Sequence, residues 1–320
     1  MIRAVLLGLL SRSTQIVVGL LVLISGALVV LKIGLEPGSS IPYLQLLPKY
    51  AIFYPWVFAT AIFAEISLLG FITSLSVLIL STKYVEKFWG YKEVLKFIFL
   101  VGTVTNFSTV IVVIIINVLR NDVLGMNLPL GGGISYYMGF LVVLKQVIPE
   151  HNVVLFKGLV NFRVKHFPFI ALVSATLWSV IFKSFYPLLP SFFAFTVSYN
   201  YLRFFQSFYA DSLLPTTNTA TTGSRDLTII RGDASDAFQF VKFFPEIMRP
   251  PLLIVIDRIY DISVLLSLIA PFDDDAIELS NLRLQSMSKQ AEKMTQKGTS
   301  DADRRRQIAL QVIEERANQQ

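Results

Sequence analysis

The fold of this chain is decided by the stretch Gly131-Gly132-Gly133-Ile134-Ser135-Tyr136-Tyr137-Met138-Gly139-Phe140-Leu141-Val142-Val143-Leu144-Lys145-Gln146, which lies midway through a series of apolar segments. Gly132, Ser135 and Gly139 are spaced by three and four residues, so they share one helical face. Small residues let neighbouring helices approach closely in a membrane. The stretch therefore predicts the central packing surface of a helix bundle, with one hydroxyl, that of Ser135, near the end where the chain enters.

The composition is that of a membrane protein. The chain has 320 residues, of which 54% are hydrophobic and 16% charged. The mean hydropathy of +0.61 is far too high for a soluble chain of this length. A formal charge of +6 in such a protein indicates orientation in the bilayer and no nucleic-acid partner.

Residue types that commonly carry chemistry are scarce. Cysteine is absent, which excludes disulfides, thiol catalysis and thiolate metal sites. His151 and His166 are the only two histidines, which leaves little room for imidazole ligands or proton transfer. We therefore expect neither a cofactor nor a metal site.

Working outward from the central stretch, the apolar runs predict six membrane-spanning helices in an all-α bundle that covers residues 1–208. Residues 35–55 are broken by four prolines and are rich in aromatic residues, which predicts a segment at the membrane surface or partly embedded against the bundle. The predicted spans are residues 14–34, 57–80, 94–119, 130–148, 167–182 and 188–208.

Lysine and arginine fall unevenly on the two sides of these spans. With the amino terminus inside, the cytosolic side holds ten (Arg3, Arg12, Lys83, Lys87, Lys92, Lys96, Lys145, Lys157, Arg163 and Lys165) and the opposite side four (Lys32, Lys49, Arg120 and Lys183). The positive-inside rule therefore predicts that both termini are cytosolic.

Beyond the sixth span the sequence becomes more polar. Residues 209–236 include a Thr- and Ser-rich run and predict a flexible linker. Residues 237–271 predict a cytosolic amphipathic or interfacial helical segment. Its part 252–270 is long enough for a seventh span, but Asp257, Arg258 and Asp261 favour a helix on the membrane or on the bundle, and both remain open. Residues 272–320 predict a polar tail that is partly helical or disordered.

Several short motifs resemble a known family. Phe-Phe-Pro-Glu at 243–246 and Tyr-Leu-Arg-Phe at 201–204 are the most specific, and Gly232-Asp233, Trp89-Gly90, Leu144-Lys145-Gln146 and His166-Phe167-Pro168-Phe169 agree with them. Over residues 10–260 the chain resembles the eukaryotic transmembrane protein 115 family. The resemblance implies a proteolytically inactive, rhomboid-like multi-pass protein of the Golgi membrane that is linked to Golgi-to-endoplasmic-reticulum retrograde traffic.

The rhomboid likeness raises the question of a serine protease, which needs a serine, a histidine base and oxyanion donors. Ser135 stands where the rhomboid nucleophile would, but Tyr136 replaces the glycine after it. Glu65, Gly70 and Ser74 stand where rhomboids carry two histidines and an asparagine, and residues 188–208 contain no histidine.

Helix geometry separates Ser135 from both histidines. His151 lies sixteen residues further along, beyond the other end of the span, which corresponds to roughly 24 Å. His166 begins the next span at that same end. A hydrogen bond between serine and base needs about 3 Å. We therefore predict no protease, and a Ser135–Lys183 dyad is a weaker alternative.

Two groups of residues are candidate interaction sites. Glu65 is the one carboxylate inside a predicted span; it is either hydrated and hydrogen-bonded near the lumenal end or part of a polar groove for a client transmembrane helix. The candidate groove consists of Glu65, Gly70, Ser74, Ser135 and Gly139. The candidate cytosolic docking residues are Arg203, Asp233, Phe238, Phe243, Phe244, Pro245 and Glu246.

Each group has a structural alternative. For Ser135 we favour a packing role in a glycine-lined contact. Arg203 is either a snorkelling anchor or an ion-pair partner of the Asp233 or Glu246 region. Phe238, Phe243 and Phe244 equally fit the buried face of a membrane-surface helix.

The sequence thus favours a non-proteolytic membrane protein of the Golgi, or also of the endoplasmic reticulum, that binds or sorts membrane-protein clients. Its expected partners are those clients, cytosolic vesicle-tethering machinery and the lipid bilayer, and homo-oligomerisation is left open. An active intramembrane hydrolase that uses Ser135 is the first alternative. A small-molecule transporter is the second, although paired ionisable groups and matching broken helices are absent.

Overall fold

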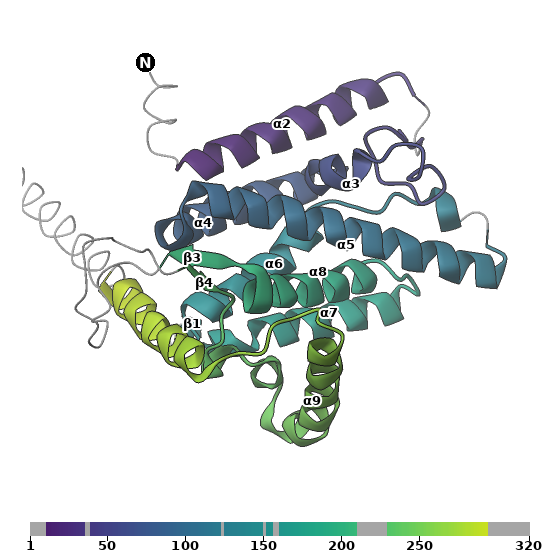
Figure 1. Cartoon of the computed structure of the whole chain (residues 1–320). Coiled ribbons are helices and arrows are strands. Elements are labelled where there is room, and N and C mark those ends of the chain that lie inside the picture. The colour runs from purple at the N-terminus through teal and green to yellow at the C-terminus, as the bar shows by residue number, and fades with distance from the viewer. Residues whose placement is uncertain are drawn as a thin grey trace, which may run out of the picture.

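The computed structural model describes residues 11–35, 39–122, 125–149, 152–155, 160–209 and 229–293 (Figure 1). Helices occupy all six predicted positions: α2 (Arg12–Lys32), α4 (Leu68–Trp89), α5 (Tyr91–Arg120), α6 (Ile134–Val147), α7 (Phe167–Ile181) and α8 (Leu188–Asn200). Within the described residues, α2, α4, α5 and the run Val164–Ile181 are long and apolar enough to cross a membrane. The prediction of an all-α membrane protein is confirmed.

The helices form a bundle with α6 at its centre. Figure 1 shows α2 at one edge and α7 at the other, with α6 and α8 between them. α6 makes its most extensive contacts with α8, and α2 packs on α4 and α5. Ten of the fourteen residues of α6 are buried, including Tyr136, Phe140 and Val143 in the main apolar cluster. The glycine-rich stretch is thus the central packing element that its sequence predicts.

The second span begins later than predicted. In place of one helix over 57–80, the structure has α3 (Val57–Thr60), the 3₁₀ turn η1 (Ala61–Phe63), an extended segment and then α4. Ser67 caps α4 by accepting a hydrogen bond from the Gly70 N–H at 3.0 Å. This serine is the signal for the break, which hydropathy alone conceals because the residues around it are apolar.

Side chains from neighbouring helices stabilise that break. Ser25 Oγ donates to the Phe63 carbonyl at 2.7 Å, and Asn106 Nδ2 donates to the Phe58 carbonyl at 2.8 Å. A backbone that leaves helical geometry at membrane depth needs such partners, because no water is available to replace them. The break is therefore part of a hydrogen-bonded core.

The segment before α3 packs against the bundle. Leu46, Leu47 and Ala51 are buried, and Leu46 forms a β-bridge with Leu130 just ahead of α6. Of the two placements expected for residues 35–55, the structure has the embedded one for the part that it describes.

Short strands occur at two places, one of which is the end of a predicted helix. α8 ends at Asn200 with one π turn, η5 (Tyr201–Phe205), so the sixth helix is shorter than the predicted run 188–208. β3 (Ser207–Tyr209) then pairs antiparallel with β4 (Ile229–Arg231). A second antiparallel pair, β1 (Asn152–Leu155) and β2 (Val160–Arg163), lies in the connection between α6 and α7.

The predicted linker over 209–236 is wrong at its carboxyl end. Residues 229–231 form β4, and Asp233, Ala234 and Ser235 are buried. Residues 210–228, which include the Thr- and Ser-rich run, lie outside the described part of the chain.

The region predicted as one interfacial helical segment contains several turns and one long helix. It has η6 (Asp236–Phe238), η7 (Phe240–Phe243), η8 (Glu246–Met248) and α9 (Arg249–Leu265). α9 has no buried residue and projects away from the bundle (Figure 1). In the predicted polar tail, residues 274–293 form a helix that buries Ser280, Met287 and Ala291, whereas 294–320 lie outside the described residues.

Candidate functional site

A polar cluster surrounds Glu65 at the amino-terminal end of α6. Glu65 Oε1 accepts a hydrogen bond from the Gly133 N–H at 2.8 Å and another from Ser74 Oγ. The hydroxyls of Ser74 and Tyr137 lie 2.5 Å apart. The carboxylate therefore caps α6, where the helix dipole favours a negative charge.

Glycine lets the segment before α6 and the start of α4 come close to the Glu65 side chain at this cluster. Gly132 has φ +95°, and a Cβ there would lie 3.3 Å from both oxygens of Glu65. A Cβ on Gly70 would lie 2.7 Å from Glu65 Oε2. Gly70 thus shares the cluster with Glu65 and Ser74 by leaving room for the carboxylate.

Ser135 and Gly139 belong to a different surface. A Cβ on Gly139 would lie 3.1 Å from Ser198 Oγ and 3.3 Å from the Phe97 ring, so this face of α6 packs against α8 and α5. Ser135 is buried, and its hydroxyl has no hydrogen-bond partner among the described residues. The structure thus brings Glu65, Gly70 and Ser74 together in the polar cluster and places Gly139 in a helix contact, and the five-residue groove stays a prediction.

No described imidazole lies beside Ser135. His166 is the residue before α7 and is close enough to Lys145 to be repelled by it, which places His166 near the carboxyl end of α6. Ten residues of helix, about 15 Å, separate Lys145 from Ser135. His151 lies outside the described residues, and Lys183 is exposed in the turn after α7.

Two apolar hollows flank α6. One of about 560 Å³ lies between α4 and α6 and is lined by Leu80, Tyr84 and Leu144, among others. The other, of about 290 Å³, lies between α6 and α7. Tyr137 and Leu141 line both, and the Tyr137 hydroxyl reaches the Glu65 cluster through Ser74. The hollows thus combine long apolar walls with one polar end.

The residues predicted for cytosolic docking are largely internal. Asp233 is buried, and its Oδ2 accepts a hydrogen bond from Gln146 Nε2 at 2.9 Å. Arg203 Nη1 donates to the carbonyls of Asp233 and Ser235 at 2.6 and 2.9 Å. Arg203 therefore binds backbone carbonyls of the Asp233 segment, and neither expected alternative, a snorkelling anchor or a carboxylate ion pair, describes it.

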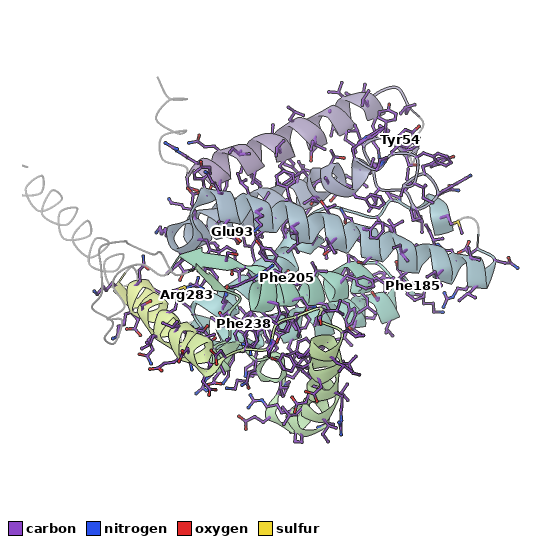
Figure 2. The ribbon with its side chains drawn as sticks, viewed as in Figure 1. Tyr54, Glu93, Phe185, Phe205, Phe238 and Arg283 are labelled. Carbon is purple, nitrogen blue, oxygen red and sulfur yellow. The ribbon has the colours of Figure 1, made fainter. Side chains whose placement is uncertain are left out.

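Phe238 and Phe243 fill the core below α8. Both are fully buried, and their rings contact that of Tyr199 with centroids 5.7 and 5.8 Å away, respectively. Figure 2 shows Phe238 between α8 and the carboxyl-terminal segments. These two rings cannot form a docking strip, because no partner can reach them.

The same region holds the helix over residues 274–293. Ser280 Oγ accepts a hydrogen bond from the Ala234 N–H at 3.1 Å, and the Arg203 guanidinium lies 4.7 Å from the Phe272 ring centroid. Arg283 lies over the ring of Phe208 at 3.0 Å, at the junction of helix and strands in Figure 2. Burial lowers the pKa of Arg283 to about 10, although Asp233 acts in the opposite direction.

Of the predicted docking residues, the last three and Arg203 are at least partly exposed. Phe244 and Pro245 are half-buried, and the Glu246 side chain is 84% exposed. Ile247 follows with 90% exposure. The most exposed of the predicted docking residues, Glu246, thus lies in this short turn before α9. Among the described residues no cluster of His, Asp or Glu could hold a metal ion.

This arrangement defines the class of the protein: a helical integral membrane protein with a rhomboid-like bundle. The family follows from the sequence profile of "Eukaryotic integral membrane protein (DUF1751)", which matches residues 14–319, and the chain belongs to that family. The resemblance to the transmembrane protein 115 family is confirmed.

Named relatives agree with this assignment. The chain is 31% identical to "Transmembrane protein 115 homolog" of Saccharomyces cerevisiae over 284 residues, which are 86% of this chain and 80% of the relative. It is 30% identical to "Rhomboid-like protein 19" of Arabidopsis thaliana over 78% of this chain and 76% of that one. It is 26% identical to "Transmembrane protein 115" of Mus musculus over 97% of this chain and 81% of that one. No solved structure matches significantly.

Several residues of these sites were missed in the sequence. Tyr137 was not among the predicted site residues, and neither were Gln146 and Gln206, whose side chains are hydrogen-bonded at 3.4 Å. Their shared property, a polar group within a strongly apolar run, is a usable signal, because buried polar groups need partners. Which partners they find depends on contacts between distant segments.

Proposed function

We propose that this chain is a non-proteolytic rhomboid-like protein that holds the transmembrane helices of client proteins along α6. In this proposal it sorts those clients in vesicle transport from the Golgi to the endoplasmic reticulum, and it resides in either membrane. The observation that carries the proposal is the pair of hollows beside α6, with a polar end at Glu65.

The chemistry of the hollows suits a helix better than a small solute. Their walls are apolar side chains from α4, α6 and α7, as a lipid-facing segment requires. The Tyr137 hydroxyl at one end offers a hydrogen bond to a polar residue of the client, which is a common form of interhelical contact in membranes.

Among the described residues no imidazole lies beside Ser135, which supports recognition without cleavage. Ser135 is buried and lies four residues before Gly139, on the helical face that packs against α8 and α5. A substrate in either hollow would therefore meet Tyr137 and Leu141 first. Family membership supports the same reading, since the relatives carry the names of transmembrane and rhomboid-like proteins.

Site-specific photo-crosslinking in native membranes tests the proposal. Leu80 lines the larger hollow and is 71% exposed, and Leu119 on α5 is 80% exposed but lies outside both hollows. A photoreactive residue at position 80 should capture a discrete set of membrane proteins, whereas one at 119 should yield mainly lipid adducts. Identical protein adducts at both positions would rule out the hollow as the client site.

A further inference from the structure

Cationic side chains gather where α6 ends and α7 begins. Lys145 comes from α6, Lys165 and His166 immediately precede α7, Lys242 belongs to η7, and Arg249 is the first residue of α9. Segments far apart in the sequence thus bring five basic side chains to one end of the bundle, the end that the charge count predicts to be cytosolic.

Lys145 is the most unusual member of this cluster. It is only 1% exposed, and its ammonium has no hydrogen-bond partner among the described residues. The ammonium lies 3.2 Å from the ring centroid of Phe243. Its charged neighbours are Lys242, Arg249 and Lys165, all of which repel it. A buried charge in such surroundings is costly unless an anion compensates it.

Aromatic packing holds the cluster together. The rings of Phe169 on α7 and Phe244 lie 5.6 Å apart, and Arg249 Nε donates to the Phe244 carbonyl at 3.3 Å. Among the described residues, the one carboxylate paired with the cluster is Glu246, which lies 3.5 Å from Arg249 and is 84% exposed. One exposed carboxylate leaves the cluster with a surplus of positive charge.

The place of the cluster indicates which anion would bind. The run Val164–Ile181 is long and apolar enough to cross a membrane, so Lys165 and His166 lie where the chain enters the bilayer. The amino terminus of α7 adds the positive end of a helix dipole. Exposed apolar residues of α9, among them Leu253 and Ile259, lie just beyond Arg249 and suit contact with acyl chains.

We propose that this cluster binds the phosphate of an anionic phospholipid headgroup. Lys165, Lys242 and Arg249 contact the phosphate, and Lys145 lies behind Phe243, where a bound anion would favour its charged form. The inference does not depend on client binding, because the cluster is at the other end of α6 from Glu65.

The test uses the full-length protein in nanodiscs of phosphatidylcholine, alone or with added phosphatidylserine or phosphatidylinositol phosphate. Native mass spectrometry counts the anionic lipid that stays bound. The double variant Lys242→Gln/Arg249→Gln should lower retention roughly tenfold or more, since each basic residue at a membrane surface favours anionic lipid several-fold. The control Lys289→Gln/Lys293→Gln removes the same charge from exposed positions on the helix over 274–293 and should leave retention unchanged.

The variant Lys145→Met distinguishes an effect on lipid binding from an effect on the stability of the fold. It should weaken lipid retention and yet raise the melting temperature in pure phosphatidylcholine, because it replaces an uncompensated charge with an apolar side chain. Equal losses of retention in the two double variants would overturn the proposal. So would a lower melting temperature for Lys145→Met, or stabilisation by free inorganic phosphate as strong as that by lipid, which would assign the site to a soluble ion.

Discussion

At the scale of single residues, two carboxylates beside α4 cap other helices. Glu65 accepts from the Gly133 N–H at the start of α6, and Glu86 Oε2 accepts from the Ser13 N–H, at 2.9 Å, at the start of α2. Each carboxylate meets the positive end of a helix dipole. The Glu65 carboxylate, which the sequence made a candidate binding residue, therefore has a structural role as well.

Replacing Glu65 tests its role as a helix cap. Glu65→Ala leaves the Gly133 N–H without its acceptor and should lower the free energy of unfolding by about 1–3 kcal/mol. Glu65→Gln keeps one acceptor oxygen and should cost less. Thermal unfolding in detergent measures both, with Glu278→Gln on an exposed helical position as control. Equal melting temperatures for Glu65→Ala and the control would contradict the capping role.

A second residue-scale prediction concerns the buried pair of Gln146 and Asp233. Because their side chains are hydrogen-bonded at 2.9 Å, a double-mutant cycle with Gln146→Ala and Asp233→Ala should give a coupling energy of about 0.5–3 kcal/mol. Unfolding of the two single variants and the double variant supplies the cycle. Strict additivity of the two changes would show that the pair does not act as a unit.

At the scale of elements, the π turn after α8 and the segment 229–235 form one latch. Gly232 N donates to the Gln206 carbonyl at 2.7 Å, and Asp233 N donates to the carbonyls of Leu202 and Arg203 at 3.1 and 3.0 Å. The motif Tyr-Leu-Arg-Phe-Phe-Gln and the motif Gly-Asp therefore bind each other directly. This contact attaches the carboxyl-terminal helix to the bundle through Ser280.

Gly232 is the most sensitive point of the latch. Its φ is +77°, and any side chain there would collide with the Arg203 carbonyl. Gly232→Ala should release β4 and the helix over 274–293, which hydrogen exchange would detect as faster exchange in both. Gly90→Ala is the matched control, since Gly90 has φ +80° but open space around it, so it should cost only backbone strain on the order of 1–3 kcal/mol. Slow exchange in both segments of Gly232→Ala would contradict the latch.

The sequence predicted elements well where long-range contacts do not decide the outcome. The centres of the six spans and the packing role of Gly139 follow from hydropathy and spacing. The break at 61–67 could not be predicted in the same way, because it depends on hydrogen bonds from Ser25 and Asn106 on other helices. Likewise, the burial of Phe238 and Phe243 depends on a return of the chain to the bundle that no local pattern indicates.

At the scale of the whole molecule, α6 separates three surfaces. One face packs against α8 and α5 and contains Ser135 and Gly139. The flanks form the hollows around Tyr137 and Leu141, and the carboxyl end contacts the basic cluster and the latch. The central claim is that clients bind on the flanks without being cut, because the one candidate nucleophile lies on the packed face and no described imidazole lies beside it.

The mass of a captured client tests that claim most directly. Membrane proteins crosslinked at position 80 are compared between the otherwise unchanged chain and one carrying Ser135→Ala. We expect clients of full length in both cases, in equal amounts. A shortened client with the native serine, and an intact one with alanine, would contradict the account and show that the protein is a protease.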